Sequence, residues 1–115
     1  LQERYDLLLD SSIIKPYQDQ NSYSALHLYP IQINLEGTNK SRQNIFSELR
    51  KNDIGVNVHY IPIHTQPYYQ KFGYQKGDFP NAEKFYSRSL SLPLYFDMTY
   101  EQQDFVLKVL ARTTS

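Results

Sequence analysis

Three stretches of this sequence alternate apolar and polar residues with the period of a β-strand, and each of them contains a proline. They are residues 24–35 with Pro30, residues 55–63 with Pro62, and residues 90–95 with Pro93. Proline has no N–H to donate to a ladder, so a strand that contains it lies at an edge, at a bulge or where one side stays unpaired. The sequence therefore predicts a small sheet of short strands.

The first stretch is the longest of the three. Its alternation puts His27, Tyr29 and Ile31 on one face of the strand and Leu26 and Leu28 on the other. We expect it to form the longest strand of the sheet.

Helical spacing is clearest between the strands and near the end of the chain. Residues 39–52 are predicted to form a helix that is capped by Thr38 or Asn39 and carries an apolar stripe. Thr99 and Gln102 form a capping box, which signals the start of a last helix. Its apolar stripe is predicted to be Phe105, Val106, Val109 and Leu110.

Prolines also mark two short helices. One begins at Pro67, with Thr65 as its cap, and the other follows Pro80 over residues 81–89. At the start of the sequence, Leu1, Tyr5, Leu8 and Leu9 have helical spacing.

The predicted helix at the start of the sequence lacks a capping residue ahead of its first turn. We therefore expect residues 1–10 to be the tail of a longer helix. The polar stretch over residues 13–22 contains Pro16 and is predicted to be an irregular connector.

The order of these elements indicates the fold class. At 115 residues the chain is long enough for one hydrophobic core, so residues 1–115 are predicted to be a single domain. Strands and helices alternate along it, which favours an α/β (α+β) two-layer arrangement. We expect a small, mostly antiparallel or mixed sheet with helices packed on one face.

The charge balance and the missing residue types argue against several classes of partner. The formal net charge is +0, with acids and bases interspersed, so nucleic acid and anionic membrane surfaces are not expected partners. The chain has no cysteine, which fits a reducing compartment and a cytoplasmic protein. No apolar run approaches the ~20 residues that span a bilayer.

Eleven tyrosines make up most of the aromatic content. Their hydroxyl groups need a hydrogen-bond partner or water, so many of these rings are expected to be only partly buried. They lie either at the rim of a small core or in a large hydrated interface.

All three histidines lie on or beside predicted strands, at His27, His59 and His64. A metal site is one interpretation, but His59 and His64 would face opposite sides of a straight strand and no third ligand has convincing spacing, so no metal is expected. A general base is a second interpretation, because imidazole titrates near neutral pH. Ordinary hydrogen bonding within the sheet is the third.

Three separated motifs resemble the C-terminal region of the DegT/StrS sugar-nucleotide aminotransferases. They are HLYPIQI, GVNVHYIPIHTQPYYQKFGY and FPNAEKFYSRSLSLPLYFDMT, and their order and spacing also match. HYIPIHTQPYY and FPNAEKFY are most similar to the aminotransferases of pseudaminic acid synthesis. The resemblance extends from about Arg4 to the end of the sequence.

The resemblance implies a fold type I enzyme that depends on pyridoxal phosphate, of which this chain is the small domain. The N-terminal domain, absent here, would hold the cofactor through a Schiff-base lysine. None of the chain's own lysines matches the family's cofactor-lysine motif, so the chain alone is expected neither to catalyse nor to bind the cofactor. The family's reaction moves an amino group, usually from glutamate, onto a keto sugar linked to a nucleotide, and the complete enzyme is expected to be a homodimer.

The resemblance also implies the site residues, all on the substrate side and none of them catalytic. His64 is the first candidate and would orient the sugar, the glutamate carboxylate or the cofactor's surroundings. His59, Tyr60 and Tyr68 are the further candidates. A different class remains open, a non-catalytic α/β module whose tyrosine-rich surface binds another protein.

Overall fold

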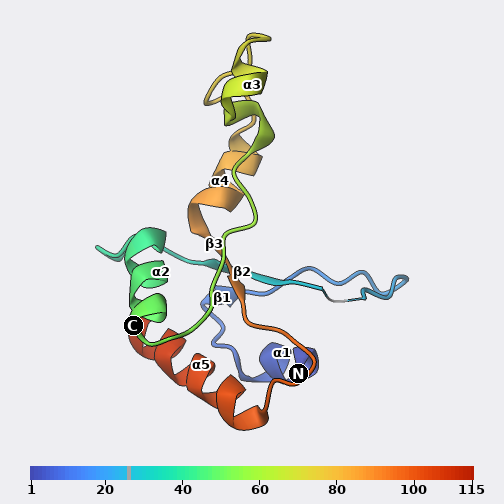
Figure 1. Ribbon diagram of the computed structural model, residues 1–115, viewed down its shortest axis with the longest axis vertical. Helices are drawn as coiled ribbons and strands as arrows, with labels where there is room; N and C mark the ends of the chain where they lie inside the picture. Colours follow the sequence, from blue (N-terminus) through green and yellow to red (C-terminus); the bar gives the residue numbers. More distant parts are fainter. Residues whose placement is uncertain (26) are drawn as a thin grey trace.

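The computed structural model describes residues 1–25 and 27–115, and Figure 1 shows how their elements are arranged. In chain order the elements are α1 (Gln2–Leu8), β1 (Ile13–Ile14), β2 (Tyr29–Ile33), α2 (Arg42–Lys51), the 3₁₀ turn η1 (Ile63–Thr65), α3 (Pro67–Gln70), α4 (Pro80–Arg88), β3 (Ser89–Leu92) and α5 (Tyr100–Thr114). Among these, no helix is both long enough and apolar enough to cross a membrane.

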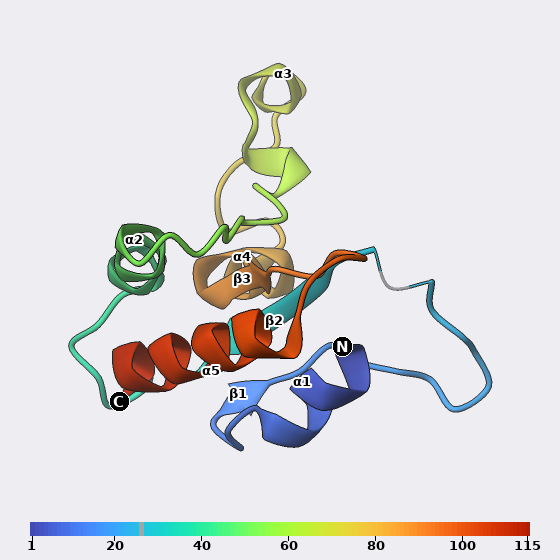
Figure 2. The ribbon, with the colours of Figure 1, turned by 60° about the horizontal axis from the view of Figure 1, so that its bottom comes forward.

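The sheet is antiparallel, with the order β1-β2-β3. Pairing of Tyr29 with Leu92 and of Ile31 with Leu90 puts these apolar side chains on one face. Figure 2 shows α5 lying across that sheet. The two-layer α+β prediction is confirmed.

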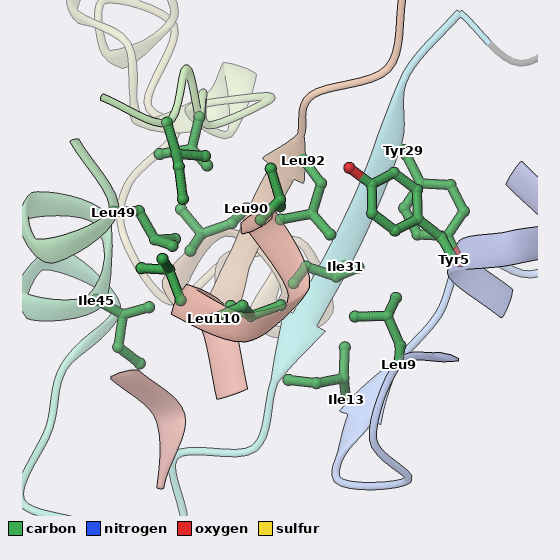
Figure 3. Packing of buried hydrophobic residues seen from close by; sticks show 14 of the residues in the cluster. Tyr5, Leu9, Ile13, Tyr29, Ile31, Ile45, Leu49, Leu90, Leu92 and Leu110 are labelled. Atoms are coloured by element: carbon green, nitrogen blue, oxygen red, sulfur yellow. The ribbon is translucent and has the colours of Figure 1, made fainter. Parts of the chain in front are cut away.

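The hydrophobic core lies between the sheet and the helices α1, α2 and α5. Each helix contributes fully or almost fully buried side chains, such as Tyr5 from α1, Leu49 from α2 and Leu110 from α5. Figure 3 shows them converging on Ile31 and Leu90 of the sheet. Burying a leucine or isoleucine contributes roughly 1.5–3 kcal/mol, so this cluster is the main stabilising contact of the fold.

The predicted strand over residues 24–35 is shorter in the structure. Only Tyr29–Ile33 joins the sheet, and Leu26 lies outside the described residues. The ladder to β3 ends at the pair of Tyr29 with Leu92, because the next residue of that partner strand is Pro93, which has no N–H. Pro30 is tolerated because β1 pairs only with Gln32 and Ile33, which leaves β2 open on that side.

The predicted strand over residues 55–63 is wrong. Only one isolated bridge forms, between Asn57 and Ser91, after which the chain leaves the sheet. Val56 is buried while Tyr60 is 65% exposed, so the alternation did not reflect one buried face.

The connector predicted over residues 13–22 contains an element that sequence reasoning missed. Ile13 and Ile14 form the short strand β1 by pairing with Ile33 and Gln32. A two-residue strand has no period to detect, and its partner lies about twenty residues away.

The predicted starts of α4 and α5 agree with the structure, whereas the predicted capping residues of α2 and α3 do not. Ser41, rather than Thr38 or Asn39, caps α2 and forms a capping box with Asn44. Gln66, rather than Thr65, precedes α3.

Residues 60–88, which we call the arm, extend away from the rest of the molecule. They contain η1, α3 and α4, and Figure 1 shows them standing above the sheet with α3 near the tip. The molecule measures 48 × 38 × 25 Å along its principal axes. Within the arm α3 packs on η1, and α4 is the helix that adjoins the sheet, next to β2.

Candidate functional site

His64 lies within the arm, in η1 next to α3, and forms the arm's main buried polar contact. Its side chain is 7% exposed, and its Nε2 lies 2.8 Å from Oε1 of Glu83 on α4. The backbone N–H of Gly77 donates to the same oxygen at 2.6 Å. One carboxylate therefore ties η1, the turn at Gly77 and α4 together.

The charge on Glu83 is stabilised by these contacts. The hydrogen bond from His64, followed by that from Gly77, holds the pKa of the Glu83 carboxyl below its usual value. Lys76 adds a smaller attraction. Glu83 is thus ionised at neutral pH and can only accept hydrogen bonds.

The His64 ring also lines an apolar cavity of about 480 Å³, which we call the aromatic pocket. Its lining consists of Ile63, His64, Tyr69, Tyr74, Phe79 and Ala82. The ring of Phe79 packs on that of His64, with 4.9 Å between centroids. Such a pocket, mostly apolar with a few polar groups from His64, Tyr69 and Tyr74, is typical of a small-molecule site.

His59 faces a different cavity, which we call the body pocket. This cavity has a volume of about 600 Å³ and is lined by His27, Asn57, His59 and Tyr95 among others. Nδ1 of His59 lies 2.9 Å from the hydroxyl oxygen of Ser91 on β3. The structure therefore brings His27 and His59 to one pocket and places His64 in another.

The two tyrosine candidates lie on the surface of the arm. Tyr60 is 65% exposed and Tyr68 is 61% exposed. The Tyr68 ring packs edge-on against Tyr69 and Phe72, and Lys71 Nζ lies 5.9 Å from its centroid. Neither candidate lines the aromatic pocket or the body pocket.

Sequence reasoning missed Glu83, Phe79 and Tyr74 as parts of the site. The motif FPNAEKFY contains two of them, and its acidic residue in the first turn after Pro80 was the available signal. Nothing in the sequence pairs Glu83 with a histidine 19 residues earlier, because the fold alone brings η1 against α4.

The chain's lysines do not build a site for a Schiff base. Lys51, Lys71, Lys76, Lys84 and Lys108 are exposed. Lys15 and Lys40, the two less exposed ones, donate to backbone carbonyls of Asp6 and Thr113. Each described lysine is therefore either exposed or hydrogen-bonded to a backbone carbonyl.

In the described part of the chain, no group of three or more His, Asp or Glu side chains is placed to hold a metal ion. The contacts found instead join histidines to one carboxylate and to one hydroxyl group.

Comparison with solved structures shows that the whole described fold recurs as one part of larger chains. Spr1654 from Streptococcus pneumoniae, whose name describes a sugar aminotransferase, is 28% identical in its PLP form, with a TM-score of 0.86; the match covers 97% of this chain and 29% of that one. Helicobacter pylori PseC, an aminotransferase of pseudaminic acid biosynthesis, is 25% identical with a TM-score of 0.84. That match covers 98% of this chain and 30% of PseC.

Comparison with curated sequences gives the same picture. The spore coat polysaccharide biosynthesis protein SpsC of Bacillus subtilis is 40% identical over 100 residues, which is 85% of this chain and 26% of SpsC. The chain spans between 23% and 28% of the length of the curated relatives that it matches. A family model for the DegT/DnrJ/EryC1/StrS aminotransferase family matches residues 2–111. The chain belongs to the DegT/DnrJ/EryC1/StrS aminotransferase family.

Proposed function

We propose that residues 1–115 are the C-terminal small domain of a sugar-nucleotide aminotransferase that depends on pyridoxal phosphate. One observation carries the proposal: 97% of the chain aligns with only 29% of a sugar aminotransferase chain, at a TM-score of 0.86. In this proposal an N-terminal domain supplies the cofactor lysine, and residues 1–10 continue a helix that joins the two domains. The chain alone neither binds the cofactor nor catalyses.

The proposed reaction transfers an amino group, with glutamate as donor, to a nucleotide-linked keto-deoxy sugar. Membership of the family supports an aminotransferase, and the name of Spr1654 supports a sugar substrate. That neighbour was solved in PLP and PMP forms, which supports pyridoxal phosphate as the cofactor of the complete enzyme. The enzyme is proposed to act in the cytoplasm.

The pathway we propose is the synthesis of a cell-surface glycan, with pseudaminic acid as the specific product. The likeness to PseC and the motif HYIPIHTQPYY support the specific assignment. The higher identity to SpsC supports the broader one, since SpsC is named for a spore coat polysaccharide.

Within this domain, His64 is the proposed first contact for the sugar nucleotide. Its ring lines a pocket of about 480 Å³ whose other walls are apolar or aromatic, and it is the buried polar group that would orient a bound ring, beside the tyrosines Tyr69 and Tyr74. His59 on the body pocket, and Tyr60 and Tyr68 on the arm, are the proposed further contacts. Their role is to position the substrate, because the bond-breaking steps belong to the cofactor.

The exposed aromatic side chains of the arm support the proposed partners. Tyr60, Tyr68, Phe72 and Phe79 are each at least 49% exposed. Aromatic residues are enriched at protein interfaces, so we propose that the arm packs against the N-terminal domain and against a second subunit of a homodimer. The same surface would serve the alternative function, an interaction module.

The test is His64→Ala in the complete enzyme. Losing one hydrogen bond to an uncharged group should lower kcat/KM for the sugar nucleotide about five- to tenfold. The absorbance of the internal imine should persist, because the cofactor lysine lies elsewhere. Tyr23→Ala, which removes a 97% exposed ring that lines neither pocket, serves as the control.

Unchanged kinetics in His64→Ala would show that this histidine only stabilises the arm. Circular dichroism of the variant separates a kinetic effect from unfolding. A native chain of 115 residues that formed an imine with added pyridoxal phosphate would contradict the proposed division between the domains.

A further inference from the structure

The contact between His64 and Glu83 has a defined direction. Glu83 is ionised and accepts from Gly77 N–H as well, so it has no proton to give to the histidine. Nε2 of His64 must therefore carry the hydrogen of the 2.8 Å bond. In the neutral ring, Nδ1 is then left with a lone pair and acts as an acceptor.

The orientation of this ring is restrained from three sides. Glu83 holds Nε2, Gly77 holds the same carboxylate oxygen in place, and the Phe79 ring packs at 4.9 Å from the imidazole. Gly77 has a φ of +98°, a conformation that L side chains rarely adopt, so the turn that holds the carboxylate depends on glycine. Among the described residues, none forms a hydrogen bond with Nδ1 of His64.

We infer that Glu83 is a positioning residue, which fixes the tautomer of His64 so that Nδ1 offers an acceptor to a ligand in the aromatic pocket. The inference rests on the proposed function, in which that ligand is the sugar nucleotide. An acceptor selects a group that donates, so the expected partner is a hydroxyl group of the sugar ring. The carboxylate of glutamate, the proposed amino-group donor, is excluded as the hydrogen-bond partner of Nδ1, because an ionised carboxylate has no hydrogen to give.

Carboxylates orient histidine rings in other proteins in the same way. A carboxylate on one ring nitrogen fixes the proton there and leaves the other nitrogen for the ligand. Glu83 does not touch the ligand in this inference, since it does not line the aromatic pocket.

The first test measures the ring itself, in the 115-residue chain. Nitrogen-15 NMR at about pH 8 should show the protonated form at Nε2 and the unprotonated form at Nδ1 of His64. Glu83→Gln keeps an acceptor oxygen and should preserve these shifts. Glu83→Ala should move both shifts toward the averaged values of a ring that exchanges tautomers.

Glu3→Ala is the matched control for this measurement. Glu3 is likewise an acidic residue in the first turn of a helix, α1, but it is exposed and far from the arm in sequence. Its removal should leave the His64 shifts unchanged. Native His64 with its proton on Nδ1, or Glu83→Ala with unchanged shifts, would overturn the inference.

The second test uses the complete enzyme. Glu83→Ala should raise KM for the sugar nucleotide about five- to tenfold with little change in kcat, whereas Glu83→Gln should stay within about twofold of the native enzyme. Two outcomes would overturn the positioning role of Glu83. One is an equal rise in KM for Glu83→Ala and Glu83→Gln. The other is an unchanged KM in Glu83→Ala when His64→Ala raises KM.

The two tests separate this inference from the proposed function. If His64→Ala leaves KM unchanged, the substrate role of His64 is wrong, and with it the role of Glu83 in binding. The nitrogen shifts then still report whether Glu83 fixes the tautomer. If the shifts contradict the inference but His64→Ala raises KM, only the role of Glu83 fails.

Discussion

Two tyrosines behave differently from the rest of this tyrosine-rich chain. Tyr5 and Tyr29 are both 0% exposed, and their rings pack with 4.9 Å between centroids. The Tyr5 hydroxyl donates to the carbonyl of Pro93 at 2.8 Å, and the Tyr29 hydroxyl donates to Asp6 at 2.5 Å. Each buried hydroxyl group therefore has the acceptor it needs.

Burial gives these tyrosines a measurable effect on stability at alkaline pH. Desolvation raises the pKa of Tyr5 and of Tyr29 above the usual value for a phenol, and the neighbouring Asp6 raises that of Tyr29 further. Above about pH 10 the unfolded chain loses these protons while the folded chain keeps them. The free energy of unfolding is therefore expected to fall above about pH 10, by up to ~1.4 kcal/mol per pH unit for each tyrosine.

Urea unfolding at several pH values measures this slope. Tyr29→Phe should lose stability at neutral pH but show a shallower alkaline decrease, and Tyr17→Phe, which changes an 87% exposed ring, should show the native slope. Parallel slopes in the native chain and Tyr29→Phe would contradict the assignment.

Among the elements, α2 shows why the start of a helix is decided within a few residues. The Ser41 hydroxyl accepts from the backbone N–H of Asn44 at 3.1 Å, and the Asn44 side chain accepts from the Ser41 N–H at 3.0 Å. Both bonds satisfy donors that the first turn would otherwise leave unpaired. Asn39, which the sequence offered as an alternative cap, is exposed.

Ser41→Ala is therefore expected to destabilise the chain by about 1 kcal/mol. Asn39→Ala, the matched control, should change the free energy of unfolding by less than about 0.5 kcal/mol. Urea unfolding at neutral pH checks both values. A larger cost for Asn39→Ala than for Ser41→Ala would mean that α2 starts earlier than the structure shows.

On the scale of the whole molecule, the chain exposes more surface than a compact protein of its mass. Its accessible area is 8205 Å², whereas a compact monomer of this size would expose about 6,600 Å². Its radius of gyration is 15.5 Å, against about 13 Å for a compact chain. The projecting arm contributes to both differences, and its exposed rings are those that a partner surface would cover.

Phe72→Ser tests this reading of the arm. Phe72 is 66% exposed, so the free energy of unfolding of the 115-residue chain should change by less than about 0.5 kcal/mol. If the arm is covered in the complete enzyme, the same change should destabilise that enzyme by about 1.5–3 kcal/mol. Calorimetry of the enzyme and urea unfolding of the chain give the comparison.

Phe96→Ser is the control, because Phe96 is 98% exposed but lies outside the arm. It should leave both proteins close to their native stability. Equal melting temperatures for native and Phe72→Ser enzymes would show that the arm stays in solvent.

Some parts of the site could be predicted from the sequence and others could not. The motif HYIPIHTQPYY identified the segment that carries His59 and His64, and the structure places His64 on a pocket. The pairing of His64 with Glu83, and of His59 with Ser91, was not predictable, because these pairs lie 19 and 32 residues apart.

By itself the sequence determined the features that depend on near neighbours. Pro80 starts α4 and the capping box of Thr99 with Gln102 starts α5, because each signal acts within one helical turn. The alternation placed Tyr29, Ile31 and Ile33 on one face, as the structure has them, since successive side chains of a strand must point to opposite sides. That this face is buried, and that His27 beyond it is exposed, was not part of the prediction.

Only the tertiary structure decided what depends on distant parts of the chain. Phe105, predicted to belong to the apolar stripe of the last helix, is 49% exposed, while Gln103 is fully buried and donates to the carbonyl of Leu1 at 2.7 Å. Periodicity identifies an apolar side of a helix but not which other element packs there. Gln103 is buried because the start of α1 lies against it. Contacts between distant parts of the chain likewise formed β1, which pairs with β2, and brought His64 to Glu83.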